Sequence, residues 1–242
     1  MSLQTIEAIH DATVWAYGLG LLVILWYAPK YGIKRFKAVT YAFVIFELVI
    51  FVNSGFTQGM ALLGVNVSYS GFRTYLLIPL FALIMCKIWK IPVFKGLDFL
   101  TPTLFFIRSV IMAGCALYGC ASAIPCAWGI YNPRIECRVF PMDLIDALIA
   151  LAAGVVSLIY AKKLKYNGNG RVFALALYMT GIVKLFLQLG STVSWGIRGL
   201  NEETVYALIA IVMAVTIFAY NRSLKGKSVE NNASTPQTGS AI

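Results

Sequence analysis

The sequence predicts an all-α integral membrane protein with about seven transmembrane helices. Of its 242 residues, 60% are hydrophobic and only 12% are charged, and a water-soluble globular domain rarely has such proportions. A hydrocarbon core about 30 Å thick needs roughly 20 apolar residues per helix, and several apolar runs approach that length. The predicted runs cover residues 12–28, 38–53, 72–89, 98–120, 142–161, 172–195 and 203–220.

The basic residues predict the orientation of these helices. Most of the 20 lysines and arginines follow the first, third, fifth and last runs, so they fall on one side of the membrane. Because cytoplasmic loops are enriched in positive residues, the N-terminus is expected outside and the C-terminus inside. The net charge of +10 then reflects topology and does not indicate a nucleic-acid partner. The residues concerned are Lys30, Lys34, Arg35, Lys37, Lys87, Lys90, Lys95, Lys162, Lys163, Lys165, Arg171, Arg222, Lys225 and Lys227.

Two regions follow along the chain. Residues 1–222 are predicted to form the membrane domain. Residues 223–242 form a cytoplasmic tail whose polar composition predicts disorder, because it has too little apolar surface to offset the entropy of ordering. The first run lacks a preceding positive charge and a following small-residue cleavage site, so we expect it to remain as a helix and not to be a cleaved signal peptide.

The cysteines leave one question open. Cys126 and Cys137 both fall in the outward loop 121–141, where an oxidising compartment would permit a disulfide, and the sequence does not decide whether they pair. The single histidine, His10, is far from the cysteines in sequence. We therefore expect no metal site and no cofactor.

Five ionisable residues fall within the predicted spans or at their ends, namely Glu47, Arg108, Asp143, Asp146 and Lys184. Ionisable groups are costly in a bilayer unless they are paired or solvated, so each is a candidate for function. At a rise of about 1.5 Å per residue, Arg108 and Lys184 lie roughly 15–20 Å from the inner boundary, so their depths match. Asp143 and Asp146 are three residues apart and share one helix face.

Two interpretations of these charges remain open. In the first, the charges pair inside the bundle and only hold helices together, since a buried ion pair need not do chemistry. In the second, Arg108 and Lys184 face a cavity open to the outer leaflet and bind a lipid phosphate, which the guanidinium fork suits well. The carboxylates nearby would then orient the two cations.

One region of the sequence resembles a known family. The stretch "LDFLTPTLFFIRSVIMAGCALYGCASAIPCAWGIY", followed by "FPMDLIDALIAL", resembles the signature region of bacterial prolipoprotein diacylglyceryl transferases. "WAYGLGLL" resembles the first span of that family at Tyr17 and Gly18, and "GRVFALALYMTGIVKLFLQL" resembles its sixth span. The matching signature residues are Leu97, Asp98, Pro102, Gly114, Leu117, Gly119, Trp128, Gly129, Pro141 and Leu144, with Asp146 where the family has a glutamate.

Several functional positions of the family are replaced. Met112 stands where the signature has an arginine, and Arg108, one helical turn earlier on the same face, is expected to substitute for it. Lys184 stands for the arginine of the sixth span and Gln188 for its carboxylate partner. The segment "TYLLIP", which contains Tyr75, stands where the family has its His-Gly-Gly stretch.

The resemblance implies an enzyme of the bacterial plasma (inner) membrane. Such an enzyme transfers a diacylglyceryl group from phosphatidylglycerol, or another anionic phospholipid, to the lipobox cysteine thiol of a prolipoprotein, whose signal peptide would be the protein partner. The implied catalytic residues are Arg108, Lys184, Asp146 and Asp143, and the implied substrate-binding residues are Tyr17, Tyr75, Gly114, Gly119 and Gln188. Two alternatives stay open: a non-catalytic relative that binds lipid or lipopeptide on the same scaffold, and a small transporter.

Overall fold

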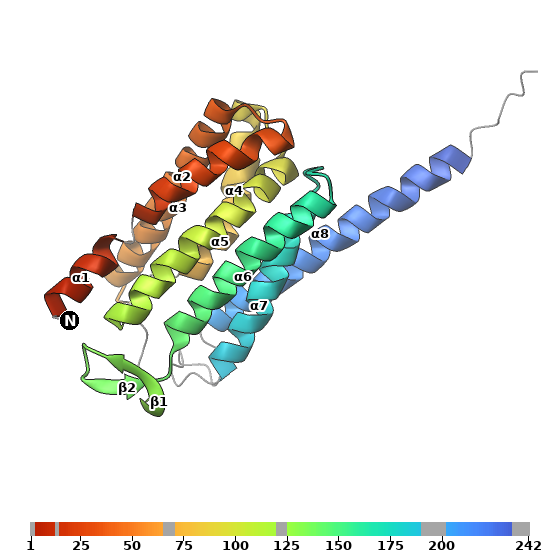
Figure 1. The fold of residues 1–242 in the computed structure, drawn as a ribbon. Helices are drawn as coiled ribbons and strands as arrows, with labels where there is room; N and C mark the ends of the chain where they lie inside the picture. The colour runs from red at the N-terminus through yellow and green to blue at the C-terminus, as the bar shows by residue number, and fades with distance from the viewer. Residues whose placement is uncertain (1–2, 13–14, 65–70, 120–124, 190–201, 234–242) are drawn as a thin grey trace, which may run out of the picture.

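The computed structural model describes residues 3–12, 15–64, 71–119, 125–189 and 202–233. It is a bundle of helices that run up and down beside one another, with a small hairpin at one end (Figure 1). The helices are α1 (Leu3–Ala12), α2 (Ala16–Tyr27), α3 (Arg35–Leu62), α4 (Gly71–Trp89), α5 (Val93–Tyr118), α6 (Met142–Lys163), α7 (Arg171–Leu189) and α8 (Glu202–Ala233), and a short 3₁₀ turn covers Ala28–Tyr31.

Four helices in the described part of the chain are long and apolar enough, by length and composition, to cross a membrane. They are Arg35–Leu62, Val93–Tyr118, Met142–Lys163 and the Thr204–Ser223 part of α8. A shorter apolar segment, Leu76–Trp89, belongs to α4. The chain is thus largely helical and has the features of a multi-pass membrane protein. Each predicted apolar run contains a helix, while seven spans and their orientation stay predictions.

The central helix of the bundle is α5, which packs against α2, α4, α6 and α7. Its rings Phe99 and Phe105 are fully buried. Glycines allow its neighbours to approach closely: a Cβ added at Gly20 of α2 would meet Ile107 of α5, and one added at Gly154 of α6 would meet the ring of Phe106. Small residues at contacts between membrane helices serve this purpose.

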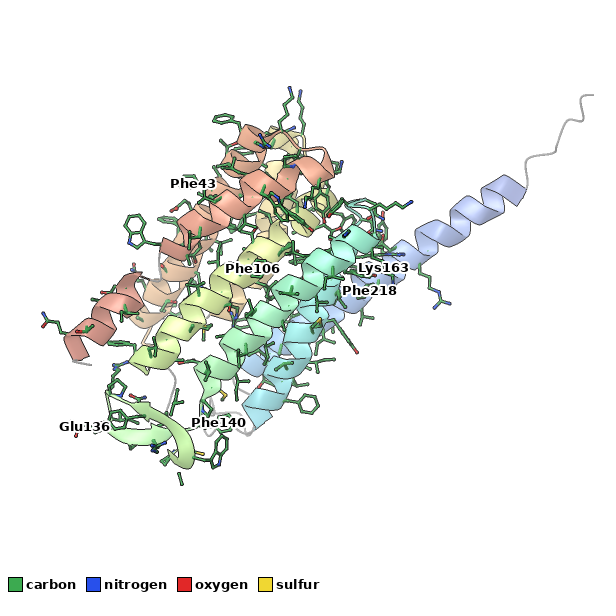
Figure 2. The ribbon with its side chains drawn as sticks, in the orientation of Figure 1. Phe43, Phe106, Glu136, Phe140, Lys163 and Phe218 are labelled. Atoms are coloured by element: carbon green, nitrogen blue, oxygen red, sulfur yellow. The ribbon has the colours of Figure 1, made fainter. Side chains whose placement is uncertain are left out.

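The basic loops gather at the end of the bundle opposite the hairpin. Figure 2 shows Lys163 at that end and Glu136 and Phe140 at the hairpin end. Two contacts tie loops together there, a hydrogen bond from Nζ of Lys37 to the carbonyl of Lys90 and the packing of Gly168 against Lys95. Lys37, Lys90, Lys95 and Lys163 thus lie at one end of the bundle.

Asp98 fixes the start of α7 at this end. Its two carboxylate oxygens accept hydrogen bonds from the backbone N–H groups of Gly170, at 2.8 Å, and Phe173, at 3.0 Å. Asn221 of α8 donates to the carbonyl of Asn169 at 2.9 Å. Because the first N–H groups of a helix lack partners within it, a carboxylate in this place both satisfies them and interacts favourably with the helix dipole.

The loop predicted to face outward contains a β-hairpin that the all-α prediction did not include. Strand β1 (Pro125–Asn132) pairs antiparallel with β2 (Cys137–Val139), and the register shifts between Pro125 and Ile130, both of which face Val139. An added Cβ at Gly129 would lie against the Val139 carbonyl, so the shifted register needs glycine there. Cys126 and Cys137 are free thiols in this hairpin.

Helices α3 and α8 extend furthest beyond the predicted boundaries. Helix α3 continues from the predicted end at residue 53 to Leu62, into the first loop that was predicted to face outward. Helix α8 continues to Ala233, so residues 223–233 of the predicted disordered tail are helical. Residues 234–242 lie outside the described part of the chain.

Candidate functional site

Three charged side chains from three helices meet inside the bundle. Arg108 of α5 contacts Asp146 of α6 through two hydrogen bonds, from Nη2 to Oδ2 at 2.6 Å and from Nε to Oδ1 at 3.3 Å. Lys184 of α7 contacts the same Oδ2 with its Nζ at 3.0 Å. We refer to Arg108, Asp146 and Lys184 as the charged triad. Both cations thus converge on one carboxylate.

The order of the helices explains this convergence. Helix α6 packs against both α5 and α7, so an acid on its inner face can reach basic residues on either neighbour. Asp146 lies four residues after Met142, where α6 begins next to the hairpin, or about 6 Å along the axis. The triad therefore lies in the half of the bundle nearer the hairpin.

The triad is buried yet not fully enclosed. The side chains of Arg108, Asp146 and Lys184 are 9%, 7% and 13% exposed. The triad itself contains two cations and one carboxylate. Because charges are strongly disfavoured in a low-dielectric interior, two buried cations favour anionic groups around them.

Asp143 lies one helical turn from Asp146, on the side toward the hairpin, and is also buried. It borders a small cavity of about 10 Å³ between the hairpin and the ends of α5 and α6, which has room for about one water molecule. The cavity is lined by Ala116, Gly119, Ile130, Asn132, Val139, Phe140, Met142 and Asp143.

Gly119 closes the end of α5 beneath the hairpin. Its φ of 80° lies in the left-handed region, which favours glycine. An added Cβ would also clash with the Asn132 side chain, so the position requires glycine for two independent reasons. Asn132 donates from Nδ2 to the Gly119 carbonyl at 3.3 Å and accepts at Oδ1 from the backbone N–H of Arg134 at 2.9 Å. The bond to Gly119 ties the hairpin to the end of α5, while the bond from Arg134 orders the turn between the two strands. The sequence did not predict a role for Asn132.

The other predicted site residues come from several parts of the bundle. Tyr17 of α2 packs edge-on against Phe46, with ring centroids 6.1 Å apart. Gly114 is buried within α5. Tyr75 and Gln188 fall in α4 and α7, but their side chains lie outside the described residues. The predicted catalytic residues thus cluster, whereas the predicted substrate-binding residues are spread along the bundle.

Glu47 differs from the other four ionisable candidates. It lies on α3 and is exposed on the outside of the bundle, away from the helices that carry the triad. The expectation that it is buried is therefore wrong.

Within the described residues, no group of three or more His, Cys, Asp or Glu side chains is placed to hold a metal ion. What the triad offers chemically is a fixed pair of cations with a carboxylate between them. Such a pair can hold an oxyanion and stabilise negative charge that develops on it.

Comparison with known proteins gave no relative: no family model, no curated protein and no solved structure matches the chain.

Proposed function

We propose that the chain binds an anionic phospholipid at the charged triad and transfers its diacylglyceryl group to the lipobox cysteine of a lipoprotein precursor at the bacterial plasma membrane. The observation that carries this proposal is the meeting of Arg108 and Lys184 at Asp146. The two cations of the triad complement the negative charge of a phosphodiester headgroup. The resemblance of residues 97–151 to prolipoprotein diacylglyceryl transferases adds to it.

The reaction makes defined demands on the site. The thiol sulfur of the precursor attacks the glycerol carbon that bears the phosphate ester, a C–S bond forms, and the C–O bond to phosphate breaks. The phosphate leaves with the bonding electrons as a glycerol phosphate anion. Arg108 and Lys184 would stabilise that anion, and the thiol proton would pass to a carboxylate, for which buried Asp143 is the candidate.

A non-catalytic lipid-binding protein on the same scaffold is the second candidate. Two bonds from Arg108 already go to Asp146, so the fork that would grip a phosphate is engaged within the chain. Met112 and Gln188 also stand where the resembled family has an arginine and a carboxylate. These features favour a site that binds a lipid headgroup without catalysing a reaction on it.

Lipidation of a reporter precursor separates the two candidates. In a bacterial strain depleted of its own diacylglyceryl transferase, the full chain is expected to restore lipidation, and Arg108→Ala and Lys184→Ala are expected to abolish it. Lys163→Ala, at the far end of α6 (Figure 2), is the matched control. Absence of rescue by a well-inserted chain rejects the enzyme. Anionic phospholipid that co-purifies with the wild type, and not with the two variants, would then support the binding protein.

A further inference from the structure

The hairpin covers a small cavity at the end of the bundle. The cavity has a volume of about 10 Å³ and lies where the hairpin meets the last turn of α5 and the first turn of α6. Ala116 and Gly119 line it at the end of α5, Asn132 lines it from β1, and Asp143 lines it from α6. A space of this size holds about one water molecule. Asp143 is the only ionisable residue among those that line it.

Two buried polar side chains border this space, one from the bundle and one from the hairpin. Asp143 is 8% exposed and Asn132 is 2% exposed. The Asn132 amide donates to the Gly119 carbonyl and accepts from the Arg134 N–H. Because an amide has two N–H donors and two acceptor lone pairs, it keeps capacity for further hydrogen bonds. A buried water needs two to four polar partners, and the carboxyl group and the amide can supply them.

The cavity lies on the hairpin side of the charged triad. Asp143 precedes Asp146 by three residues on α6, which is about 4.5 Å along the axis, and the two share one helix face. A buried carboxyl group exchanges its proton through a neighbouring group that can both accept and donate one. Water does so, whereas the guanidinium of Arg108 keeps its protons in proteins. The cavity is therefore the place where Asp143 can exchange a proton toward the hairpin end.

We propose that the cavity binds one water molecule, and that this water exchanges the proton of Asp143 with the solvent at the hairpin end. The inference rests on the proposed function, in which Asp143 takes the thiol proton of the precursor. The S–H bond breaks as the sulfur attacks, and the proton adds to the Asp143 carboxylate. The resulting carboxylic acid gives the proton to the water, which passes it to solvent. Asp143 is then a carboxylate again and can accept the proton of the next thiol.

Asn132 is a positioning residue in this arrangement. Its bond to Gly119 ties the hairpin to the end of α5, so its amide stays beside the cavity and can orient the water toward Asp143. A water that only joined the hairpin to α6 would fill the same space without carrying a proton. The two roles differ in one measurable quantity, the rate at which Asp143 exchanges its proton with solvent when the cavity is filled.

Infrared spectroscopy of the full chain in phosphatidylcholine vesicles measures this rate. Acidification converts Asp143 to its carboxylic acid, whose absorption is the band that Asp143→Asn lacks, and rapid mixing with deuterium oxide shifts the band as the proton exchanges. Ala116→Val fills the cavity from α5, and Ile130→Phe fills it from the hairpin. Each is expected to slow the shift about tenfold or more, because the relaying water is excluded. Ala113→Val, one turn earlier on α5 and not part of the cavity lining, is the matched control.

Exchange as fast in both filled variants as in the wild type overturns the proposal, as does equal slowing by Ala113→Val or a wild-type band that does not exchange. The lipidation assay separates this result from the proposed function. In an active chain, Ala116→Val should lower kcat about tenfold and leave the KM for phospholipid within about threefold of wild type. An unchanged kcat overturns the role of the water in turnover. An inactive chain whose Asp143 band responds as expected rejects the transfer reaction and retains the water site.

Discussion

Arg108 holds Asp146 in a two-point contact, with Nη2 2.6 Å from Oδ2 and Nε 3.3 Å from Oδ1. This geometry fixes the orientation of the carboxylate and leaves its Oδ2 shared with Lys184 at 3.0 Å. The acid therefore acts as the common partner that holds two cations at a fixed separation. Removal of the acid and removal of a cation should consequently have different effects.

Asp146→Asn is expected to destabilise the folded chain more than any single change at the two cations. The amide keeps the shape but removes the negative charge, so Arg108 and Lys184 lose the carboxylate that both contact in a buried place. Breaking a buried pair in this way costs about 3–5 kcal/mol. Equilibrium unfolding by detergent titration measures the loss.

The matched comparison is the apolar triple variant Arg108→Met, Asp146→Leu, Lys184→Met. Replacement of a whole buried ion group by apolar residues is often neutral for stability, so this variant should regain most of the stability that Asp146→Asn loses and should not bind anionic lipid. A triple variant that is stable and retains lipid binding would contradict the role of the triad.

Lys184→Arg and Lys184→Met are expected to separate charge from geometry. Arginine retains the positive charge next to Asp146, whereas methionine leaves the remaining pair neutral. We expect Lys184→Met to lower the amount of anionic phospholipid that co-purifies about tenfold, because one of the two cations is removed, and Lys184→Arg to stay within about threefold of wild type. Mass spectrometry of the bound lipid provides the measurement, with Lys163→Ala as the control. Equal loss in both Lys184 variants would show that charge is not the determinant.

The sequence predicted part of this site because depth along a helix is a simple product of residue count and rise. Arg108 and Lys184 were placed at matching depth in this way, and the three-residue spacing placed Asp143 and Asp146 on one face. Their common contact with one carboxylate depends on the rotation of α5, α6 and α7 about their axes. Long-range packing, such as that of Gly154 against Phe106, sets the rotation of each helix. The sequence alone therefore could not predict this common contact.

The hairpin was missed although the sequence contained a signal for it. "CAWGIYN" is rich in the aromatic and branched residues that strands prefer, and Asn132-Pro133 is a turn signal. The shifted register at Gly129 depends on its close approach to Val139, and no local pattern predicts it. Helix α3 runs past its predicted end at residue 53 to Leu62, through Gly55 and Gly59. Glycine is more frequent in membrane helices than in the helices of soluble proteins, so it is a weak signal for the end of a membrane helix.

Asp98→Ala is expected to destabilise the chain by about 2 kcal/mol or more, because it leaves the N–H groups of Gly170 and Phe173 buried without an acceptor. Asp98→Asn retains one acceptor oxygen and should lose less. Detergent-titration unfolding provides the measurement, and Glu136→Ala, on the exposed turn of the hairpin (Figure 2), is the control. Equal stability of Asp98→Ala and the control would mean that the two bonds do not hold the start of α7.

The hairpin thiols test the orientation of the bundle and the state of Cys126 and Cys137 together. A variant that keeps only these two cysteines is expected to react with a membrane-impermeant maleimide added to intact cells, without prior reduction, because both are free thiols at the end predicted to face outward. A variant that keeps only Cys86 should react only after the membrane is permeabilised, because Cys86 lies next to Lys87 in the last turn of α4, at the end of the bundle opposite the hairpin. Labelling of the hairpin variant that requires a reductant would show that the two cysteines are joined. If Cys86 reacted in intact cells and the hairpin cysteines did not, the predicted orientation would be wrong. The charged triad would then lie nearer the inner leaflet, where an outer-leaflet lipid could not reach it.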